Sequence, residues 1–283
     1  MAIVARRASS DERTDAELIE AARAGDSTAA EVLFVRYEAP IYRIGLRMCR
    51  DPEDAKEVLQ ETLLAAARTL PEFRGDAAVG TWLYAIARSF CIKMRRRHGR
   101  SVVTTSTDNA DDEISSVVDP AELPDDAAAG RQVGAALQKA ISELARPYRE
   151  VLVLRDVEGL TAPEVAAALG IGVDAVKSRL HRARVAVRDK VAPLLDPAPL
   201  APATSACPDV LHLYSQRVEG EVDATLCHEM EQHVAHCGRC SAACESLKRT
   251  LSLCLSAGHD APVPERVQAS VRRAVREVLR FPS

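Results

Sequence analysis

The stretch Tyr148–Val191, YREVLVLRDVEGLTAPEVAAALGIGVDAVKSRLHRARVAVRDKV, contains three helix-length segments separated by two short turns. Thr161 followed by Glu164 fits a capping box at the start of the middle segment, and Gly170 fits its end. Apolar residues recur at spacings that would pack the three segments together, namely Val165, Leu169, Ile171, Val176, Leu180 and Val187. The stretch therefore predicts helix, turn, helix, turn, helix.

The last of these helices is strongly basic. Residues 173–190 contain six Lys or Arg against two Asp. A basic helix in this place is typical of a helix-turn-helix, whose second helix enters the DNA major groove with the polar residues of its first turns. A solvated helical face is the alternative for such a segment. The predicted DNA-reading residues are Lys177, Ser178, Arg179, His181 and Arg182, while Arg184 and Arg188 suit phosphate contacts.

The rest of the chain is also predicted to be helical. It has 283 residues, of which 47% are hydrophobic and only 4% are aromatic, and alternating β-branched runs are scarce. We therefore expect an all-α protein of two or three domains. The N-terminus has no apolar signal region, and no later run approaches the ~18 apolar residues that cross a bilayer. We expect a cytoplasmic protein without membrane contact, whose eight Cys are reduced at rest, which points to metal or redox use rather than disulfides. Cys49 and Cys91 are expected to be small core residues of predicted helices, and the other six follow position 206.

Two segments have the composition of linkers. Residues 101–130 contain eight acids and no Lys or Arg, and they lack helical periodicity, which predicts a flexible linker over residues 99–130. A Pro-rich and Ala-rich segment predicts a second linker over 193–204. The predicted domains are therefore residues 14–98, 131–192 and 205–281.

The first domain has an acidic helix face. In DPEDAKEVLQETLLAAARTL, residues 51–70, Pro52 lies in the first turn of a predicted helix. One face is apolar, and the other presents Asp54, Glu57, Gln60 and Glu61. Such a face is usually only solvated, but it also suits docking of a basic partner.

Aromatic residues concentrate next to a basic cluster. Seven of the ten aromatic residues lie between Phe34 and Phe90, and Lys93 and residues 95–97 follow them. Rings stack on unpaired bases while cations hold the backbone, so this arrangement suits single-stranded nucleic acid. The alternative is an aromatic core with a basic helix end.

Taken together, these motifs resemble the bacterial RNA polymerase sigma factors of the extracytoplasmic-function group. The resemblance rests on DPEDAKEVLQETLLAA, FRGD, TWLYAIAR, the acidic linker and VKSRLHRAR, in that order over residues 14–190. It implies a dissociable initiation subunit rather than an enzyme, with sigma region 2 at 14–98 and region 4 at 131–192. The linker is then expected to thread a positively lined channel of the polymerase; a plain flexible tether is the alternative.

The resemblance also implies roles for individual residues. Asp54, Glu57, Gln60 and Glu61 would dock on the β′ clamp helices of the polymerase core. The −10 element of promoter DNA would be opened and bound by Phe73, Trp82, Arg88, Arg95, Arg96 and Arg97. The −35 element would be bound by Lys177, Ser178, Arg179, His181, Arg182 and Arg184. Ser89 and Val79 depart from the family's usual Asn and aromatic residues, which leaves the −10 preference open.

The segment after the second linker contains a metal-binding motif. His233, Cys237 and Cys240 form H-x3-C-x2-C, which matches zinc-site spacing. A closed tetrahedral site needs a fourth ligand, for which we select Cys207. Competing ligands are Cys227, His228, His236 and Cys244.

The complete spacing, C-x25-H-x3-C-x2-C, resembles the zinc-binding anti-sigma fold over residues 205–255. Zn²⁺ is the expected ion, and another soft metal is an alternative. In separate anti-sigma proteins of this type a last helix packs on the sigma factor, so the amphipathic helix predicted after Pro264 could fold back onto residues 14–190. The hypothesis is an internal regulator that responds to metal or thiol state; the alternative is a zinc site that only stabilises the fold.

Two other functions are weighed. A helix-turn-helix regulator without polymerase does not explain TWLYAIAR. A catalytic zinc keeps an open position, whereas the selected Cys and His set is closed.

Overall fold

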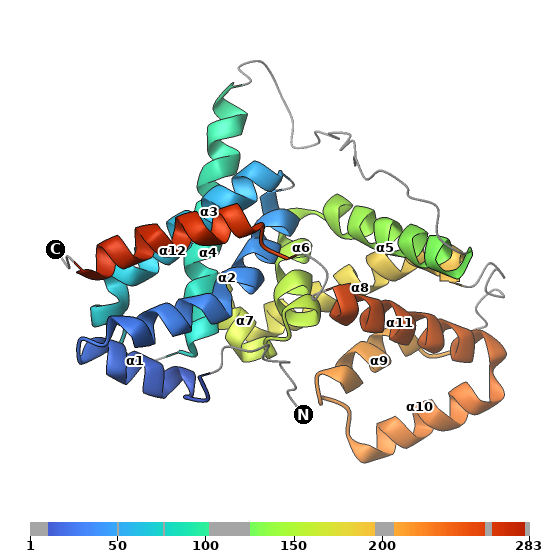
Figure 1. Cartoon of the computed structure of the whole chain (residues 1–283). Coiled ribbons are helices and arrows are strands. Elements are labelled where there is room, and N and C mark those ends of the chain that lie inside the picture. The colour runs from blue at the N-terminus through green and yellow to red at the C-terminus, as the bar shows by residue number, and fades with distance from the viewer. Residues whose placement is uncertain are drawn as a thin grey trace. The chain divides into compact units, whose positions relative to one another are not determined.

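All regular secondary structure in the described part of the chain is helical (Figure 1), which confirms the all-α prediction. The computed structural model describes residues 11–49, 51–75, 77–101, 125–195, 207–257 and 262–280. The chain divides into two units. Unit 1 consists of Met1–Glu122 and Ala261–Ser283, and unit 2 consists of Leu123–Asp260.

Unit 1 contains the first helices of the chain and its last one. They are α1 (Asp15–Arg23), α2 (Ser27–Cys49), α3 (Pro52–Thr69), the short turn η1 (Leu70–Glu72), α4 (Val79–Ser101) and α12 (Glu265–Arg280). The core is formed by large apolar side chains that are almost completely buried, including Leu18, Leu33, Ile41, Leu59, Leu63 and Leu83. Helix α12 packs against α2 and α3, so the last helix of the chain shares this unit with the first ones (Figure 1).

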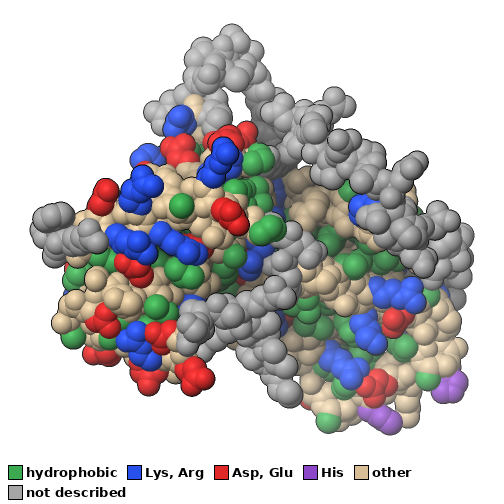
Figure 2. Space-filling model, in the orientation of Figure 1, with side chains coloured by type: hydrophobic (Ala, Val, Ile, Leu, Met, Phe, Trp, Pro, Cys, Tyr) green, Lys and Arg blue, Asp and Glu red, His purple; other side chains and the backbone are tan. Residues whose placement is uncertain are grey.

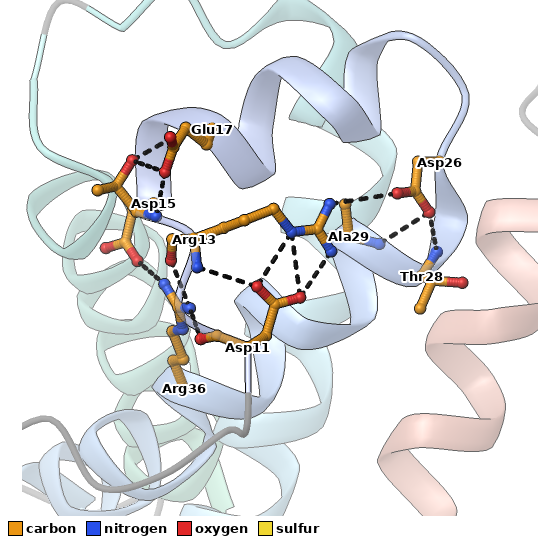
Figure 3. A network of polar contacts seen from close by, with 9 residues as sticks. Asp11, Arg13, Asp15, Glu17, Asp26, Thr28, Ala29 and Arg36 are labelled. Carbon is orange, nitrogen blue, oxygen red and sulfur yellow. Dashed lines mark hydrogen bonds and ion pairs between the residues drawn. The ribbon is translucent and has the colours of Figure 1, made fainter.

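The start of α1 is tied to α2 by a polar network (Figure 3). Thr14 and Glu17 form a capping box, which satisfies free N–H groups of the first turn. Arg36 of α2 donates to Asp15 at 2.8 Å and to the backbone carbonyl oxygens of Asp11 and Arg13 at 2.8 and 2.6 Å. Hydrogen bonds from Arg13 lower the pKa of Asp11 to about 2. The network fixes the entry of the chain into unit 1.

Helices α2 and α3 approach closely at Gly45. A Cβ atom at this position would lie 2.9 Å from the Cα atom of Ala55, so only glycine fits without movement of the backbone. Helix α3 begins at Pro52 as predicted, and Asp51 caps it by accepting from the N–H groups of Glu53 and Asp54. This crossing positions the acidic face of α3.

Unit 2 contains the predicted three-helix stretch and the cysteine-rich segment. Its first helices are α5 (Asp125–Glu143), α6 (Arg146–Leu152), the π-helical turn η2 (Val153–Val157), α7 (Ala162–Leu169) and α8 (Val173–Leu195). The predicted capping box of Thr161 and Glu164 starts α7. Gly170 ends α7 with a φ of 65°, in the left-handed region that glycine adopts without strain. Helix α8 packs against α5, α6 and α7 through its apolar side, where Val176, Leu180 and Val187 are fully buried.

Three further helices complete unit 2, namely α9 (Val210–Val218), α10 (Ala224–His236) and α11 (Gly238–Ala257). We call residues 207–257 the cysteine module. Helices α9 and α11 of this module both pack against α8. The predicted reading helix is therefore contacted by the segment that follows it in the chain.

Most of the two predicted linkers lies outside the described residues, at 102–124 and 196–206. Helix α5 begins at Asp125, within the segment predicted as the first linker, and α8 continues through Pro193 to Leu195 at the start of the second. In the described part of the chain, no helix is long and apolar enough to span a membrane.

We predict that Gly45→Ala destabilises unit 1 by about 1–3 kcal/mol, because the new Cβ forces the backbones of α2 and α3 apart. Thermal unfolding followed by circular dichroism should show a midpoint lower by several degrees. The matched control is Gly134→Ala in α5, where a Cβ meets nothing within 4 Å. That substitution should leave the midpoint unchanged or raise it. Equal midpoints for the two variants would contradict the close crossing.

Candidate DNA-binding surfaces and metal centre

Helix α8 carries the residues predicted to bind the −35 element, and they differ in exposure. Ser178 and Arg182 are exposed, and Arg179 is half-buried. Arg182 also donates to the hydroxyl of Tyr148 at 3.4 Å. Lys177, His181 and Arg184 contact residues at or near α9, as described next. The predicted set is therefore divided between an open part and a covered part.

Arg184 is completely buried and lies at the centre of an ionic network. Its Nε and Nη2 atoms donate to the two carboxylate oxygens of Asp156 at 2.8 and 2.7 Å. Nη2 also donates to Glu219 at 2.6 Å, and Nη1 donates to the Ser215 hydroxyl at 2.9 Å. Burial alone would lower the pKa of Arg184, but Asp156 and Glu219 raise it overall. Two elements beyond α8, η2 and the end of α9, thus hold one guanidinium group.

Lys177 and His181 contact the same part of the cysteine module. Lys177 forms an ion pair with Glu221, and this hydrogen bond raises the pKa of Lys177. The ring of His181 lies edge-on to that of His212, with centroids 4.7 Å apart and an interplanar angle of 86°. These side chains are therefore held by α9 and by the turn that follows it.

Further along α8, Arg188 is also buried. Its Nε atom donates to the Ser246 hydroxyl of α11 at 3.3 Å, and its Nη1 atom donates to Asp189 at 2.8 Å. The residue predicted as a phosphate contact is therefore covered by α11.

In unit 1, the four residues predicted to dock on polymerase all lie on α3. Glu57, Gln60 and Glu61 are half-buried on this helix, and Asp54 lies in its first turn. Glu57 accepts from Nη1 of Arg97 at 3.0 Å, so a predicted docking residue pairs with a predicted DNA-binding residue. Arg95, Arg96 and Arg97 are exposed near the end of α4.

The aromatic residues of this unit are packed against one another. Phe73 is only 9% exposed, and its ring centroid lies 4.7 Å from that of Trp82, which is half-buried. Tyr84 is buried and contacts Tyr37 edge-on at 6.4 Å. Arg88 is half-buried on α4. Phe73 and Trp82 contribute to packing in this structure, as the alternative of an aromatic core expected.

Helix α12 binds to α2 through ion pairs that flank an apolar contact. Arg272 donates to both carboxylate oxygens of Glu38 at 2.8 and 2.7 Å, and Arg276 donates to Glu31 at 2.9 Å. Val271 and Val275 are buried beside them. They line a small cavity with Phe34, Val35 and Leu63. Figure 2 shows Lys and Arg side chains among Asp and Glu side chains on the face that carries α12.

The cysteine module brings four predicted metal ligands together. Side-chain ligand atoms of Cys207, His233, Cys237 and Cys240 all lie within 4.8 Å of one another. The sulfur atoms of Cys207 and Cys237 are 3.9 Å apart. Two thiolates at ~2.3 Å from a tetrahedral zinc ion would be separated by about this distance. Three sulfurs and one imidazole therefore form a set that could hold Zn²⁺ or another soft metal.

Local structure explains why these residues meet. His233 lies one turn before the end of α10, Cys237 has the extended conformation that ends this helix, and Cys240 lies in the first turn of α11. Cys207 precedes α9, whose N-cap is Asp209. Val210 of α9 is buried against Cys240 and Cys244, which brings the start of α9 to the hairpin of α10 and α11.

The competing ligands have other environments. Cys227 contacts Glu231 at 3.8 Å, and His228 and His236 contact the side chain and backbone of Gln232. Cys244 is buried in the apolar cluster. Within the described residues, the group with Cys207 is the one whose geometry suits a metal. His side chains near α10 reach the surface of unit 2 (Figure 2).

Burial of Cys240 has a chemical consequence. The Cys240 side chain is fully buried. This burial is the main cause that raises the pKa of Cys240 to about 12, and the nearby thiols of Cys237 and Cys207 add to it. A thiolate there needs a positive charge beside it. A bound soft metal cation would supply that charge, lower the pKa of the thiols and bind them as thiolates.

Several residues that make these contacts were not selected from the sequence. Glu219 and Glu221 belong to the turn EGEV between α9 and α10, and Glu31 and Glu38 are scattered along α2. Nothing in their local patterns marks them, because each matters through a partner far away in the chain. The available signal was the amphipathic helix predicted after Pro264, in which Arg272 and Arg276 lie.

The fold and these surfaces define a helical DNA-binding protein of the transcription-initiation class. Two family models match the chain, Sigma-70 region 2 over residues 33–101 and Sigma-70 region 4 over residues 134–187. The RNA polymerase sigma-H factor of Pseudomonas aeruginosa is 33% identical over 185 residues, which cover 64% of this chain and 95% of that protein. The ECF RNA polymerase sigma-E factor of Escherichia coli K12 is 31% identical over 190 residues, covering 66% of this chain and 98% of that protein.

The chain therefore belongs to the ECF sigma factors of the sigma-70 family, as the sequence motifs indicated. It is a transcription initiation factor that directs RNA polymerase to promoters. Among solved structures, CnrH in complex with the cytosolic domain of CnrY aligns with a TM-score of 0.47 and 25% identity. That alignment covers 65% of this chain and 99% of the matched chain.

The contact between His181 and His212 predicts a pH effect. Burial, and then His212, lower the pKa of His181 from 6.5; Arg184 and Arg182 act in the same direction and Asp209 opposes them. Neutral His181 thus stabilises the fold fully above pH 6.5, and this contribution is lost as the pH falls through the lowered pKa. An NMR titration should place the pKa of His181 below 6.5 and show it closer to 6.5 in His212→Ala.

The control for this titration is His228→Ala on the exposed side of α10, which should leave the His181 signal unchanged. A pKa of His181 at or above 6.5 in the full chain would contradict the burial of His181 beside His212.

Proposed function

We propose that this sigma factor is held inactive by its own C-terminal residues. The cysteine module covers the −35-reading helix of region 4, and α12 covers the polymerase-binding helices of region 2. The observation that carries the proposal is the burial of Arg184, a predicted promoter contact, under α9 and its following turn. DNA cannot reach a guanidinium group that is fully buried by the same chain.

The residue roles implied by the family are retained in this proposal. Region 4 reads the −35 element with Lys177, Ser178, Arg179, His181 and Arg182, and Arg184 contacts phosphate after release. Region 2 opens and binds the −10 element with Phe73, Trp82, Arg88 and residues 95–97. The pairing of Arg97 with Glu57 supports a link between DNA binding and polymerase docking on this surface.

For polymerase docking, we assign Asp54, Glu57, Gln60 and Glu61 on α3 to the β′ clamp helices. Helix α12 packs against α3 as well as α2. It is anchored by the bidentate ion pair of Arg272 with Glu38, a carboxylate that is only 4% exposed. A helix in this place competes with any helix of the polymerase that needs α3.

The metal site offers a route to regulation through α9. Cys207 lies just before the start of α9, while Ser215 and Glu219, which hold Arg184, lie near its end. Zn²⁺ or another soft metal bound by Cys207, His233, Cys237 and Cys240 would fasten the first end of α9. Loss of the metal, or oxidation of the thiols, would free that end and weaken the grip on Arg184.

Transcription assays with core polymerase test the proposal. On a library of templates with randomised −10 and −35 segments, we expect the chain ending at residue 192 to give at least about tenfold more transcript than the full chain, which corresponds to about 1.4 kcal/mol of masking. Such a chain should fold, because ECF relatives align with this protein over nearly their whole length. Circular dichroism checks its helix content.

A metal-dependent switch further predicts that a chelator, or Cys237→Ser, raises the activity of the full chain and leaves the shortened chain unaffected. Metal content is measured on the same samples. If the full and shortened chains are equally active, the proposed masking is wrong. If only shortening raises activity, the metal site has a purely structural role.

The contact of α12 can be tested separately. We predict that the double variant Arg272→Ala with Arg276→Ala binds core polymerase several-fold more tightly than the unchanged full chain, because two ion pairs to α2 are lost and α12 is held less tightly. The measurement is a titration of fluorescently labelled chain with core polymerase.

The matched control is Arg266→Ala with Arg249→Ala, which removes the same charge from exposed positions of the C-terminal residues. Equal affinities for the two double variants would mean that α12 does not restrict docking on region 2.

A further inference from the structure

The turn between α9 and α10 carries two carboxylates that both engage cations of region 4. Glu219 contacts Arg155 and Arg184, and Glu221 contacts Lys177. The positive φ of Gly220, 75°, allows the tight turn that presents these two acids. The cysteine module therefore contacts the basic surface of region 4 by charge as well as by packing.

Glu219 lies between two guanidinium groups. Its Oε2 atom accepts from Nε of Arg155 at 3.0 Å, and its Oε1 atom accepts from Nη2 of Arg184 at 2.6 Å. The Glu219 side chain is 5% exposed, so these are charge-assisted hydrogen bonds largely shielded from water. Arginine binds carboxylate and phosphate with the same fork of donors. Glu219 thus presents the oxygens that a phosphate group of DNA would present.

Glu221 has the same relation to Lys177, which lies near the start of α8. The side chains of Lys177 and Glu221 are 29% and 27% exposed. Cations flanking the first turns of a recognition helix are placed to contact the DNA backbone, which fixes the register of the helix in the groove. Lys177 cannot make such a contact while Glu221 holds its ammonium group.

The charges of this network balance. In region 4, Arg155, Lys177 and Arg184 face one internal carboxylate, Asp156, which leaves a net charge of +2. Glu219 and Glu221 reduce this charge to zero. A positive surface attracts DNA in a sequence-independent manner, and neutralisation removes that attraction.

We propose that Glu219 and Glu221 occupy phosphate-binding positions of region 4, so that the cysteine module and the DNA backbone compete for the same three cations. This inference rests on the proposed function and specifies its mechanism. The cysteine module excludes DNA from region 4 by neutralising its cations as well as by steric obstruction. Arg155, outside the residues predicted from the sequence, joins the phosphate-binding set.

The test measures binding of the full chain to a fluorescent duplex of random sequence, about 30 base pairs long, because phosphate binding does not depend on base sequence. We expect Glu219→Gln with Glu221→Gln to lower the dissociation constant at least about tenfold at low salt. Every additional phosphate that the protein neutralises steepens the slope of log K against log salt by about 0.9. The double variant should therefore have a slope steeper by between about one and three.

The control variant is Glu229→Gln with Glu245→Gln, which makes the same change in net charge at exposed positions of the cysteine module. Glu221→Gln alone, at the module's surface, provides a second variant if Glu219→Gln impairs folding. It should produce a smaller increase in affinity.

The outcomes separate this inference from the proposed function. If the chain ending at residue 192 binds the duplex no better than the full chain, the proposed masking fails. If the shortened chain binds more tightly but the Glu219 and Glu221 variants do not exceed the control, masking stands and is steric, and the phosphate-mimicking role of the two carboxylates is wrong.

Discussion

The constraint on which unit 2 depends is the buried guanidinium group of Arg184. A charge with no exposure must be paired and hydrogen-bonded, because its desolvation is otherwise too costly. Asp156 supplies one partner from within region 4, whereas Glu219 and Ser215 come from the cysteine module. Removing one partner of a buried ion pair costs about 3–5 kcal/mol, because it leaves an uncompensated charge in the interior, so Arg184 can stay buried only while its partners stay in place.

Unit 1 uses a related but weaker arrangement. The carboxylate of Glu38 is buried while its partner Arg272 is 39% exposed, and the pair of Arg276 with Glu31 is more open still. Ion pairs with exposed members contribute only about 0–1 kcal/mol. The apolar contact of Val271 and Val275 must therefore supply much of the binding of α12. Such a contact suits the proposed displacement of α12 by polymerase.

Helix α9 connects the candidate metal site of the cysteine module to the ion pairs that the module forms with region 4. Its first residues are held beside the metal-ligand set, and its last residues hold the cations of region 4. Helix α9 has nine residues, and backbone hydrogen bonds fix each of its turns. Its two ends are therefore expected to move together. In the proposed mechanism, this helix links metal occupancy to DNA access without any residue that contacts both a metal ion and DNA.

The sequence by itself determined the local features of this protein. Capping residues such as Thr161, the left-handed Gly170 and apolar periodicity specify helices through neighbours within a few positions, and H-x3-C-x2-C specifies three ligands within one hairpin. Only the tertiary structure decided that Cys207, rather than one of its four competitors, meets that hairpin. It alone also decided that Glu219 meets Arg184 and that Arg272 meets Glu38. The physical reason is that a single Glu or Arg does not belong to a repeating pattern in the sequence from which its partner could be predicted. Its partner is chosen by the packing of whole helices, which brings together side chains separated by up to 245 positions.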